Sequence, residues 1–411
     1  MKTPSTGAEM KITNVRIRQL EGTMTYPGTF WEERLRLPND IYPNFKKRGG
    51  ELMSQEPVLL KDGVYKIRGQ FLQIDTDEEV SGTAGPMFFK SAALYICTQL
   101  RPLLVGQDAM AVERLWDQMY RNAIHGRKGE NMAAISYVDI ALWDIKGKWL
   151  GVPVYKLLGG PVQERIPAYA SCLCYSIEPG EVRRRVKDFL KQGYTGCKWF
   201  VREGPQDGPE GVRKNIELVR TVRKAGGPDM KIMIDAWNSW DVPYTMKMAE
   251  LLGEYDPYWF EEPVMPDMVE SSARLRSMCP VPIAGGEHEY TRWGAKMLMD
   301  KGALDIYQFD ATWAGGISEL TKICTLASVY DVPVIPHGVS MQATVQVAFA
   351  QNTVIVPMLE YLIAEQERFQ HFLKHRIKPV DGFITPPDVA GVGIELDEDR
   401  IESEKDIDWD N

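Results

Sequence analysis

Six side chains that can bind a metal ion or transfer a proton recur at nearly regular intervals along the chain. Each of them lies at the end of a short apolar run such as "KIMID" or "YWFE". They are Asp235, Glu261, Glu287, Asp310, His337 and Glu360, at successive steps of 26, 26, 23, 27 and 23 residues. One strand-helix unit of a parallel barrel has about this length, and the carboxyl ends of barrel strands form a single rim. The spacing therefore predicts that all six side chains converge on one site.

Five carboxylates and one imidazole on one rim need a counter-charge. A single acidic residue after an apolar run is more often a solvated strand end, but six residues in register are not explained in that way. Neighbouring carboxylates repel each other and raise each other's pKa. A divalent cation removes the conflict, and ligation by a few oxygen atoms is typical of Mg²⁺, which keeps positions open for water and substrate. We therefore expect a magnesium site.

The run "WFEEPV" contains two adjacent carboxylates, Glu261 and Glu262. Neighbouring side chains of a strand point to opposite faces, so only one of the two can face the barrel axis. The spacing from Asp235 to Glu287 selects Glu261 as the inward residue and the metal ligand. Glu262 is expected to point outward, where it would pair with a neighbouring cation, and Pro263 is expected to end the strand.

The elements that must position these residues follow from the rest of the pattern. Residues 10–20 alternate like a half-exposed strand, and residues 131–151 have helical spacing that ends at Gly151. Strands followed by helices suggest a first, α+β domain. Beyond it, short apolar runs alternate with helical stretches, which is typical of a parallel sheet, and about eight such strands close a barrel. The runs after "RIPAYASCLC" are "GCKWFV", "KIMIDAW", "YWFEEPV", "VPIAGGE", "DIYQFD", "VPVIPHG" and "VPMLEYL".

Composition argues against several other classes of protein. The 411-residue chain has a net charge of -9, whereas nucleic-acid binding needs a basic surface. The first ten residues lack the apolar core of a signal peptide, and no segment reaches the length of a membrane span. The six cysteines are scattered, as reduced core residues of cytosolic proteins are. We expect a cytoplasmic protein with no nucleic-acid or membrane partner.

Four motifs resemble the enolase superfamily, in its mandelate racemase and muconate lactonizing enzyme branch. They are "AAISYVDIALWDIKGKWLGVPVYKLLGG", "MIDAW", "WFEEP" and "GGE". The resemblance implies an α/β fold, a (β/α)7β modified TIM barrel with an α+β capping domain. The capping domain would span residues 10–155, the barrel 160–385, and a C-terminal segment returning to the capping domain 386–411. It also implies Mg²⁺ held by Asp235, Glu261 and Glu287, and a homo-oligomer, either a dimer or an octamer.

Within that branch, "GEHEYT", "QFDATWAGG" and "IPHGVS" are similar to rhamnonate dehydratases. This resemblance implies abstraction of the proton α to a carboxylate, an enediolate intermediate, and dehydration of an acid sugar (an aldonate) to a 2-keto-3-deoxy acid. Two departures concern the substrate and the reaction. Phe200 follows Lys198 where many racemases of the branch have a second lysine, and the early loop lacks the histidine of rhamnonate dehydratases, because the first histidine is His125.

The roles of the catalytic residues can be argued physically. His337 is the expected base, because an imidazole transfers protons near neutral pH. Asp310 would hold its tautomer and stabilise the imidazolium. Glu360 would hydrogen-bond the substrate carboxylate, its enediolate or a hydroxyl group. Lys198 would add a cation beside the substrate carboxylate.

Other side chains are candidates for contact with the substrate. His288 directly follows Glu287, so it faces the site only if the strand ends there, and Arg202 contacts either the substrate or a surface carboxylate. Trp31 and Phe88, with the neighbouring Phe89, are expected to form a lid that excludes water, or else to pack between the domains. His371 and His375 are interpreted as surface residues rather than a metal-binding pair.

Three functions remain open at this stage. The first is the acid-sugar dehydratase. The second is an epimerase or cycloisomerase of a related sugar acid or lactone. Phe200 disfavours the two-base epimerase but does not bear on the cycloisomerase. The third is a non-catalytic binding protein that retains the fold, which the apparently complete set of site residues disfavours.

Overall fold

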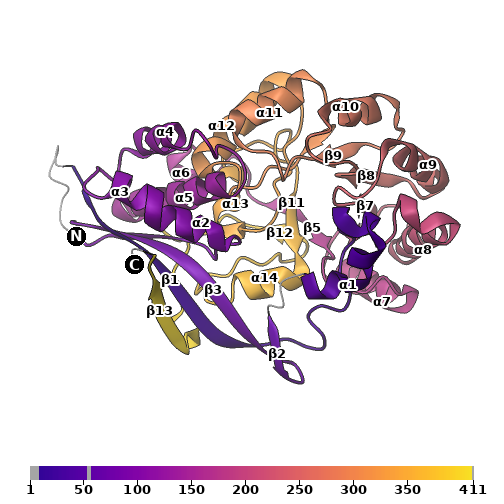
Figure 1. The fold of residues 1–411 in the computed structure, drawn as a ribbon, viewed down its shortest axis with the longest axis horizontal. Helices are drawn as coiled ribbons and strands as arrows, with labels where there is room; N and C mark the ends of the chain where they lie inside the picture. The colour runs from indigo at the N-terminus through magenta and orange to yellow at the C-terminus, as the bar shows by residue number, and fades with distance from the viewer. Residues whose placement is uncertain (1–8, 53–56, 410–411) are drawn as a thin grey trace.

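The structure is a computed structural model that describes residues 9–52 and 57–409. Residues 1–8, part of the stretch in which no signal peptide was expected, lie outside this range. Figure 1 shows two parts of the molecule. At the left an antiparallel sheet is packed against helices, and at the right strands and helices form a ring. In the part of the chain that is described, no helix is both long enough and apolar enough to span a membrane.

The antiparallel sheet joins the two ends of the chain. Its strand order is β13-β1-β3-β2, and β4 pairs with β3. The strands are β1 (Ile12–Thr25), β2 (Val58–Lys61), β3 (Val64–Thr76), β4 (Ser81–Ala84) and β13 (Ser403–Ile407). β1 and β3 pair along their whole length, from Ile12 opposite Thr76 to Thr25 opposite Val64. Buried and exposed side chains alternate along much of both strands, so one face of the sheet is apolar and is covered by helices.

The N-terminal part of the chain also contributes helices. They are α1 (Pro43–Leu52), α2 (Lys90–Tyr95), α3 (Arg101–Leu104), α4 (Val112–Asn122) and α5 (Glu130–Leu150). The last of them contacts β3 and β4 of the antiparallel sheet, whereas the first lies away from that sheet (Figure 1). α5 is the helix expected from spacing, and it ends at Gly151, whose φ of 68° is left-handed. Gly82 allows β4 to approach α5, because a Cβ there would lie 2.0 Å from the carbonyl oxygen of Ala141.

The parallel sheet confirms the predicted α/β fold class. Its strand order is β10-β9-β8-β7-β6-β5-β11, and β12 (Phe383–Ile384) pairs antiparallel with β5. The parallel strands are β5 (Ile166–Ser171), β6 (Gly196–Phe200), β7 (Lys231–Asp235), β8 (Pro257–Glu261), β9 (Ile283–Gly285), β10 (Ile306–Tyr307) and β11 (Leu359–Leu362). The expected strand in "VPVIPHG" is reduced to a parallel bridge between Val334 and Tyr307.

Helices follow the strands in turn and surround the parallel sheet (Figure 1). They are α6 (Val154–Leu157), α7 (Pro179–Lys191), α8 (Gly208–Gly226), α9 (Val242–Leu252), α10 (Val269–Met278), α11 (Thr291–Asp300), α12 (Gly316–Tyr330), α13 (Met341–Ala348) and α14 (Ile363–Phe369). Inside the curled sheet, one strand after another contributes a side chain to a small apolar cluster that includes Met233, Trp259 and Ile335. Met233, Trp259 and Ile335 each lie two residues before an ionisable residue of the rim, so this apolar layer lies below the rim on the same face of the strands.

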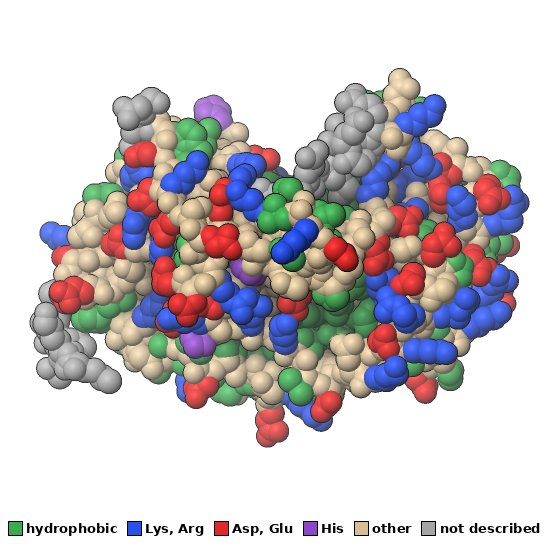
Figure 2. All heavy atoms as spheres, turned by 90° about the horizontal axis from the view of Figure 1, so that it is seen from below, with side chains coloured by type: hydrophobic (Ala, Val, Ile, Leu, Met, Phe, Trp, Pro, Cys, Tyr) green, Lys and Arg blue, Asp and Glu red, His purple; other side chains and the backbone are tan. Residues whose placement is uncertain are grey.

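Two surface features bear on the sequence predictions. The face shown in Figure 2 carries intermixed acidic and basic side chains rather than one continuous basic area. His375 is exposed as expected, but His371 is only 4% exposed. The expectation that His371 is a surface residue is therefore wrong, because its ring packs edge-on against Phe372 under the antiparallel sheet.

Candidate active site

The carboxyl ends of the parallel strands open into a cavity of about 670 Å³ between the two parts of the molecule. Side chains from the N-terminal part, including Trp31, Phe88 and Phe89, form one wall. The strand ends supply the ionisable groups of the opposite wall. Those that reach the cavity are Lys198, Asp235, Glu287, His288 and His337.

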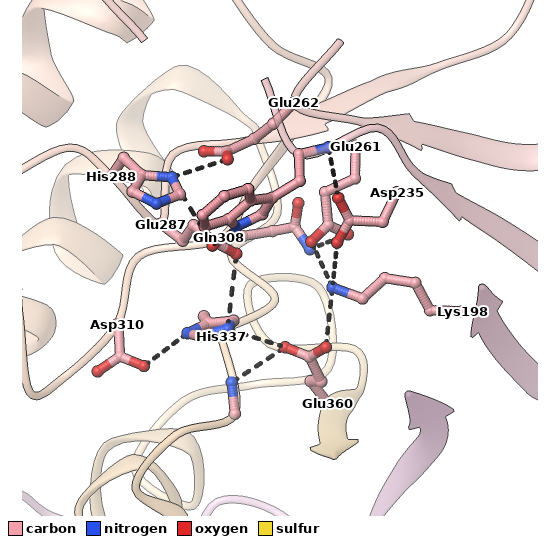
Figure 3. A network of polar contacts seen from close by, with 12 residues as sticks. Lys198, Asp235, Glu261, Glu262, Glu287, His288, Gln308, Asp310, His337 and Glu360 are labelled. Atoms are coloured by element: carbon pink, nitrogen blue, oxygen red, sulfur yellow. Dashed lines mark hydrogen bonds and ion pairs between the residues drawn. The ribbon is translucent and has the colours of Figure 1, made fainter. Parts of the chain in front are cut away.

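Lys198, on β6, is the centre of a buried ionic cluster (Figure 3). Its ammonium lies 3.1 Å from Asp235 Oδ2 and 2.8 Å from Glu360 Oε1, and it also contacts Glu261 Oε1. Burial by itself would lower the pKa of Lys198, but the surrounding carboxylates raise it well above its usual value. Burial likewise opposes ionisation of Glu360, whose pKa Lys198 nevertheless lowers. Lys198 is therefore a permanent cation in the cluster.

Glu261, at the end of β8, points into the barrel as the spacing predicted. Trp259 Nε1 donates to Glu261 Oε2 at 3.0 Å, and Gln308 Nε2 donates to the same oxygen at 2.8 Å. Sequence reasoning did not single out either of these two residues. A usable signal existed for Gln308, which is two residues before Asp310 in "QFDATWAGG" and so falls on the same face of an extended segment.

Glu262 pairs with a neighbouring cation, His288, as predicted, but its side chain is buried and does not point outward, so that part of the prediction is wrong. Glu262 Oε2 accepts from Asn238 Nδ2 at 2.8 Å and contacts His288 Nδ1 at 2.8 Å. The physical reason is local: the strand ends at Glu261, and Glu262 has a φ of 41°, which breaks the alternation. Burial lowers the pKa of His288, but Glu262 outweighs it and raises that pKa to about 9.

The predicted metal ligands are buried carboxylates that have too little positive charge around them. Burial raises the pKa of Asp235 to about 6, of Glu261 to about 8 and of Glu287 to about 7. Among the described residues, Asp235 Oδ2 has no hydrogen-bond partner, and it lies 3.1 Å from the Lys198 ammonium. Three buried carboxylates with an unsatisfied oxygen fit a hard divalent cation.

The geometry brings together a different trio most closely. Among the described residues, the set of three potential ligands whose donor atoms all lie within 4.8 Å of one another is Glu262, Glu287 and His288. It shares only Glu287 with the predicted trio, because Asp235 and Glu261 are drawn to Lys198. The assignment of Asp235, Glu261 and Glu287 as ligands therefore stays a prediction.

His337 and Asp310 form the expected pair. His337 Nδ1 lies 2.9 Å from Asp310 Oδ2, while Oδ1 of Asp310 accepts from the backbone N–H of Thr312 at 2.6 Å. His337 Nε2 faces the ionic cluster, 3.6 Å from Glu287 Oε2 and 3.9 Å from Glu360 Oε2. Burial by itself would lower the pKa of His337, but these carboxylates raise it to about 10.

The remaining predicted residues fall into two groups. Trp31, Phe88 and His288 line the cavity. Arg202 is not among the described residues that do so: its guanidinium donates to the carbonyl oxygens of Phe200 and Tyr175, at 2.7 and 2.8 Å. It also pairs with Glu33 at 3.5 Å, so the alternative salt bridge exists, but Arg202 is buried. A substrate contact by Arg202 would require these bonds to break.

Comparison with known families agrees with this arrangement. Residues 181–400 match the family described as "Enolase C-terminal domain-like", and residues 60–159 match "Mandelate racemase / muconate lactonizing enzyme, N-terminal domain". The chain belongs to the mandelate racemase and muconate lactonizing enzyme branch of the enolase superfamily. The resemblance that the four sequence motifs carried is thereby confirmed.

Individual members of the superfamily are similar over most of the chain. An L-rhamnonate dehydratase of Saccharopolyspora erythraea is 34% identical over 79% of this chain and 82% of its own. The crystal structure of rhamnonate dehydratase from Gibberella zeae complexed with Mg has a TM-score of 0.80, at 29% identity over 96% of each chain. The 3,6-anhydro-D-galactonate cycloisomerase from Zobellia galactanivorans has a TM-score of 0.76, at 28% identity over 96% of this chain and 100% of its own.

Proposed function

We propose that this protein is a Mg²⁺-dependent dehydratase that converts an acid sugar, an aldonate of the rhamnonate type, into a 2-keto-3-deoxy acid. The observation that carries the proposal is the His337–Asp310 pair, which faces buried carboxylates and Lys198 across one cavity. The similarity to two rhamnonate dehydratases supports an aldonate as the class of substrate.

His337 would remove the α-proton at Nε2, since its Nδ1 is engaged with Asp310. To accept a proton it must be neutral, whereas its pKa is raised to about 10 by the nearby carboxylates. A cation that neutralises Glu287 would lower that pKa toward the neutral range. We infer that His337 can accept a proton only when a cation neutralises the negative charge of the carboxylates around it.

Asp235, Glu261 and Glu287 would hold the metal ion in this proposal. When bound, Mg²⁺ supplies Lewis-acid stabilisation of the negative charge that develops on the substrate carboxylate. Lys198, fixed between Asp235 and Glu360, adds a second positive charge on the same side of the cavity. Mg²⁺ and Lys198 would stabilise the negative charge that develops on the substrate when His337 removes the α-proton.

The second half of the reaction needs an acid. His337, now carrying the α-proton, would transfer a proton to the β-hydroxyl oxygen, the C–O bond would break, and water would leave. The resulting enol rearranges to the 2-keto-3-deoxy acid, so that the overall change is the loss of one water molecule. The use of one residue for both transfers predicts a syn elimination, because both groups must be on the side of the substrate that faces His337.

A panel of six-carbon and five-carbon aldonates incubated with the protein and Mg²⁺ tests the proposal. We expect a 2-keto-3-deoxy acid from at least one aldonate, no product in the presence of EDTA, and at least a 10³-fold loss of kcat in His337→Asn with unchanged Mg²⁺ binding. Formation of keto acid by His337→Asn at the wild-type rate would exclude His337 as the base.

A cycloisomerase of a sugar-acid lactone or anhydro sugar is the second candidate, favoured by the similarity of the whole chain to the Zobellia galactanivorans cycloisomerase. Phe200, beside Lys198 in the cavity, disfavours a two-base epimerase because its ring cannot transfer a proton. A sugar-acid lactone and an anhydro sugar acid added to the panel separate these functions. Ring opening by elimination gives a product of unchanged mass, whereas dehydration of an aldonate lowers the mass by one water. Absence of any turnover and of any aldonate binding would favour a non-catalytic protein.

A further inference from the structure

Trp313 lies on the same turn as Asp310, and its ring covers a face of His337. The turn after β10 is closed by the backbone N–H of Ala314, which donates to the carbonyl oxygen of Asp310 at 2.8 Å. The ring centroids of Trp313 and His337 are 4.9 Å apart with an interplanar angle of 38°. Trp313 is only 5% exposed although it lines the cavity. One turn therefore supplies both the hydrogen-bond partner and the face contact of the imidazole.

The Trp313 ring also contacts Phe88 and Phe89 in the capping loop, which is the loop of residues 85–89 between β4 and α2. The centroid of the Trp313 ring lies 5.5 Å from that of Phe88, in an edge-on contact, and 5.9 Å from that of Phe89. The loop itself is anchored, because the backbone N–H of Phe88 donates to the hydroxyl of Tyr137 on α5 at 2.9 Å. Trp313 thus connects the capping domain with His337.

A single hydrogen bond does not fix an imidazole ring. The Asp310–Nδ1 bond sets one ring atom and the tautomer, but the ring can still tilt about the line that joins Nδ1 to the carboxylate. The position of Nε2, which must meet the α-proton, depends on this tilt. A contact over the ring face removes the remaining freedom, and misplacement of a reacting atom by about 1 Å can cost about 10²-fold in rate.

We propose that Trp313 is a positioning residue for His337, and that the capping loop acts on the reaction through it. The kinetic part of this inference rests on the proposed dehydratase function, whereas the position of His337 can be measured in the absence of turnover. The indole of Trp313 is neither an acid nor a base near neutral pH, so it does not exchange a proton with the substrate carbon. Its Nε1 has no hydrogen-bond partner among the described residues and Trp313 lines the cavity, so KM is measured beside kcat to separate positioning of the base from substrate binding.

Trp313→Leu, which removes the ring, and Trp313→Phe, which keeps one, test this role by kinetics on the Mg²⁺-loaded protein. We expect Trp313→Leu to lower kcat about 10²-fold with KM within about threefold, because an atom of the base is displaced. Trp313→Phe should recover at least a tenth of wild-type kcat. A rise in KM with unchanged kcat would instead make Trp313 a substrate-binding residue and overturn the proposal.

Nitrogen NMR of protein labelled in its five histidines provides the second readout. The Nδ1 proton signal assigned to His337 (absent in His337→Asn) should be sharp in the wild type and in Trp313→Phe, and broadened or lost in Trp313→Leu. Trp199→Leu is the matched control, because Trp199 is also a buried indole. Among the described residues its Nε1 has no hydrogen-bond partner and it does not line the cavity. An unchanged His337 signal in Trp313→Leu would overturn the proposal even if no substrate is found.

Phe88→Ala tests whether the capping loop acts through Trp313. In the wild-type background we expect kcat to fall by about tenfold, whereas in Trp313→Leu the same change should have less than a twofold effect on kcat. Equal effects in the two backgrounds would show that Phe88 acts independently, and would overturn the coupling. If no aldonate is turned over by the wild type, the dehydratase proposal fails, while the NMR measurement still tests the position of His337.

Discussion

The charge on Lys198 and the charges on the carboxylates around it depend on each other. The Lys198 side chain is 1% exposed and contacts three acidic groups, each of which is also buried. Removing one partner from a buried ion pair is unfavourable because the other is left without compensation. If the proposed metal ligands are correct, the ammonium and a divalent cation are two sources of positive charge for the same carboxylates.

Lys198→Met removes the ammonium with little change in volume. Without divalent cations, we expect the free energy of unfolding to fall by about 3–5 kcal/mol, the usual cost of breaking a buried ion pair. Mg²⁺ should restore more stability to this variant than it adds to the wild type, because the carboxylates then have only the ion as counter-charge. Urea unfolding with EDTA and with Mg²⁺ measures both quantities.

Lys148→Met is the control for this prediction. Lys148 pairs at 2.6 Å with Asp144, a fully buried carboxylate on α5 that is not part of the ionic cluster. Its substitution should destabilise the protein without increasing the response to Mg²⁺. Equal gains of stability from Mg²⁺ in wild type and Lys198→Met would contradict the idea that Lys198 and the ion share ligands.

At the scale of elements, the C-terminal strand β13 protects the first strand of the chain. It pairs antiparallel with β1 over five residue pairs, from Ile17 opposite Ile407 to Glu21 opposite Ser403. Arg18 on β1 also donates to Glu404 Oε2 at 2.7 Å. Without β13, β1 would be an exposed edge, and such edges promote association between chains.

Deletion of residues 402–411 removes β13 and tests its role. We expect a loss of about 1–5 kcal/mol in unfolding free energy, from five cross-strand pairs of about 0.2–1 kcal/mol each, together with aggregation on heating. The value of kcat should be unchanged, because β13 is not part of the cavity wall. Calorimetry and steady-state kinetics provide the readouts, and deletion of 408–411 alone is the control. A fall in kcat with unchanged stability would contradict this assignment.

At the scale of the whole molecule, His371 lies where the end of the barrel meets the antiparallel sheet. Its neighbour Phe372 packs edge-on against Phe71 of β3, with centroids 6.3 Å apart. Nε2 of His371 is buried and has no hydrogen-bond partner in the part of the chain that the structure describes. Burial, with the positive charges of Arg376 and Arg400, lowers the pKa of His371 from 6.5 to about 4, against the smaller influence of Asp397 and Glu402.

This lowered pKa predicts an acid sensitivity that involves both parts of the protein. Because His371 is neutral in the folded state, its contribution to stability is complete above pH 6.5 and is lost as the pH falls through about 4. The difference in unfolding free energy between wild type and His371→Gln should therefore decrease over this window, by at most about 1.4 kcal/mol per pH unit. Urea unfolding at several pH values measures it, with exposed His375→Gln as the control. A difference independent of pH would contradict the prediction.

The sequence by itself determined the α/β class, the helix that ends at Gly151 and the strands at whose ends, or just beyond, Asp235, Glu261 and Glu287 lie. Element lengths are encoded locally, by apolar periodicity and by the glycine and proline residues that end each element. A regular step between strand ends therefore predicts which residues share a rim, without any knowledge of distances between strands.

Only the tertiary structure decided how those residues are paired. The left-handed backbone at Glu262 turned its carboxylate toward His288, and the curvature of the sheet brought Lys198 between Asp235 and Glu360. Trp313 became important for the same reason, through a contact with His337 that no spacing encodes. Distances across strands depend on sheet curvature and loop backbone angles, which arise from packing of the whole chain and not from the order of residues along one segment.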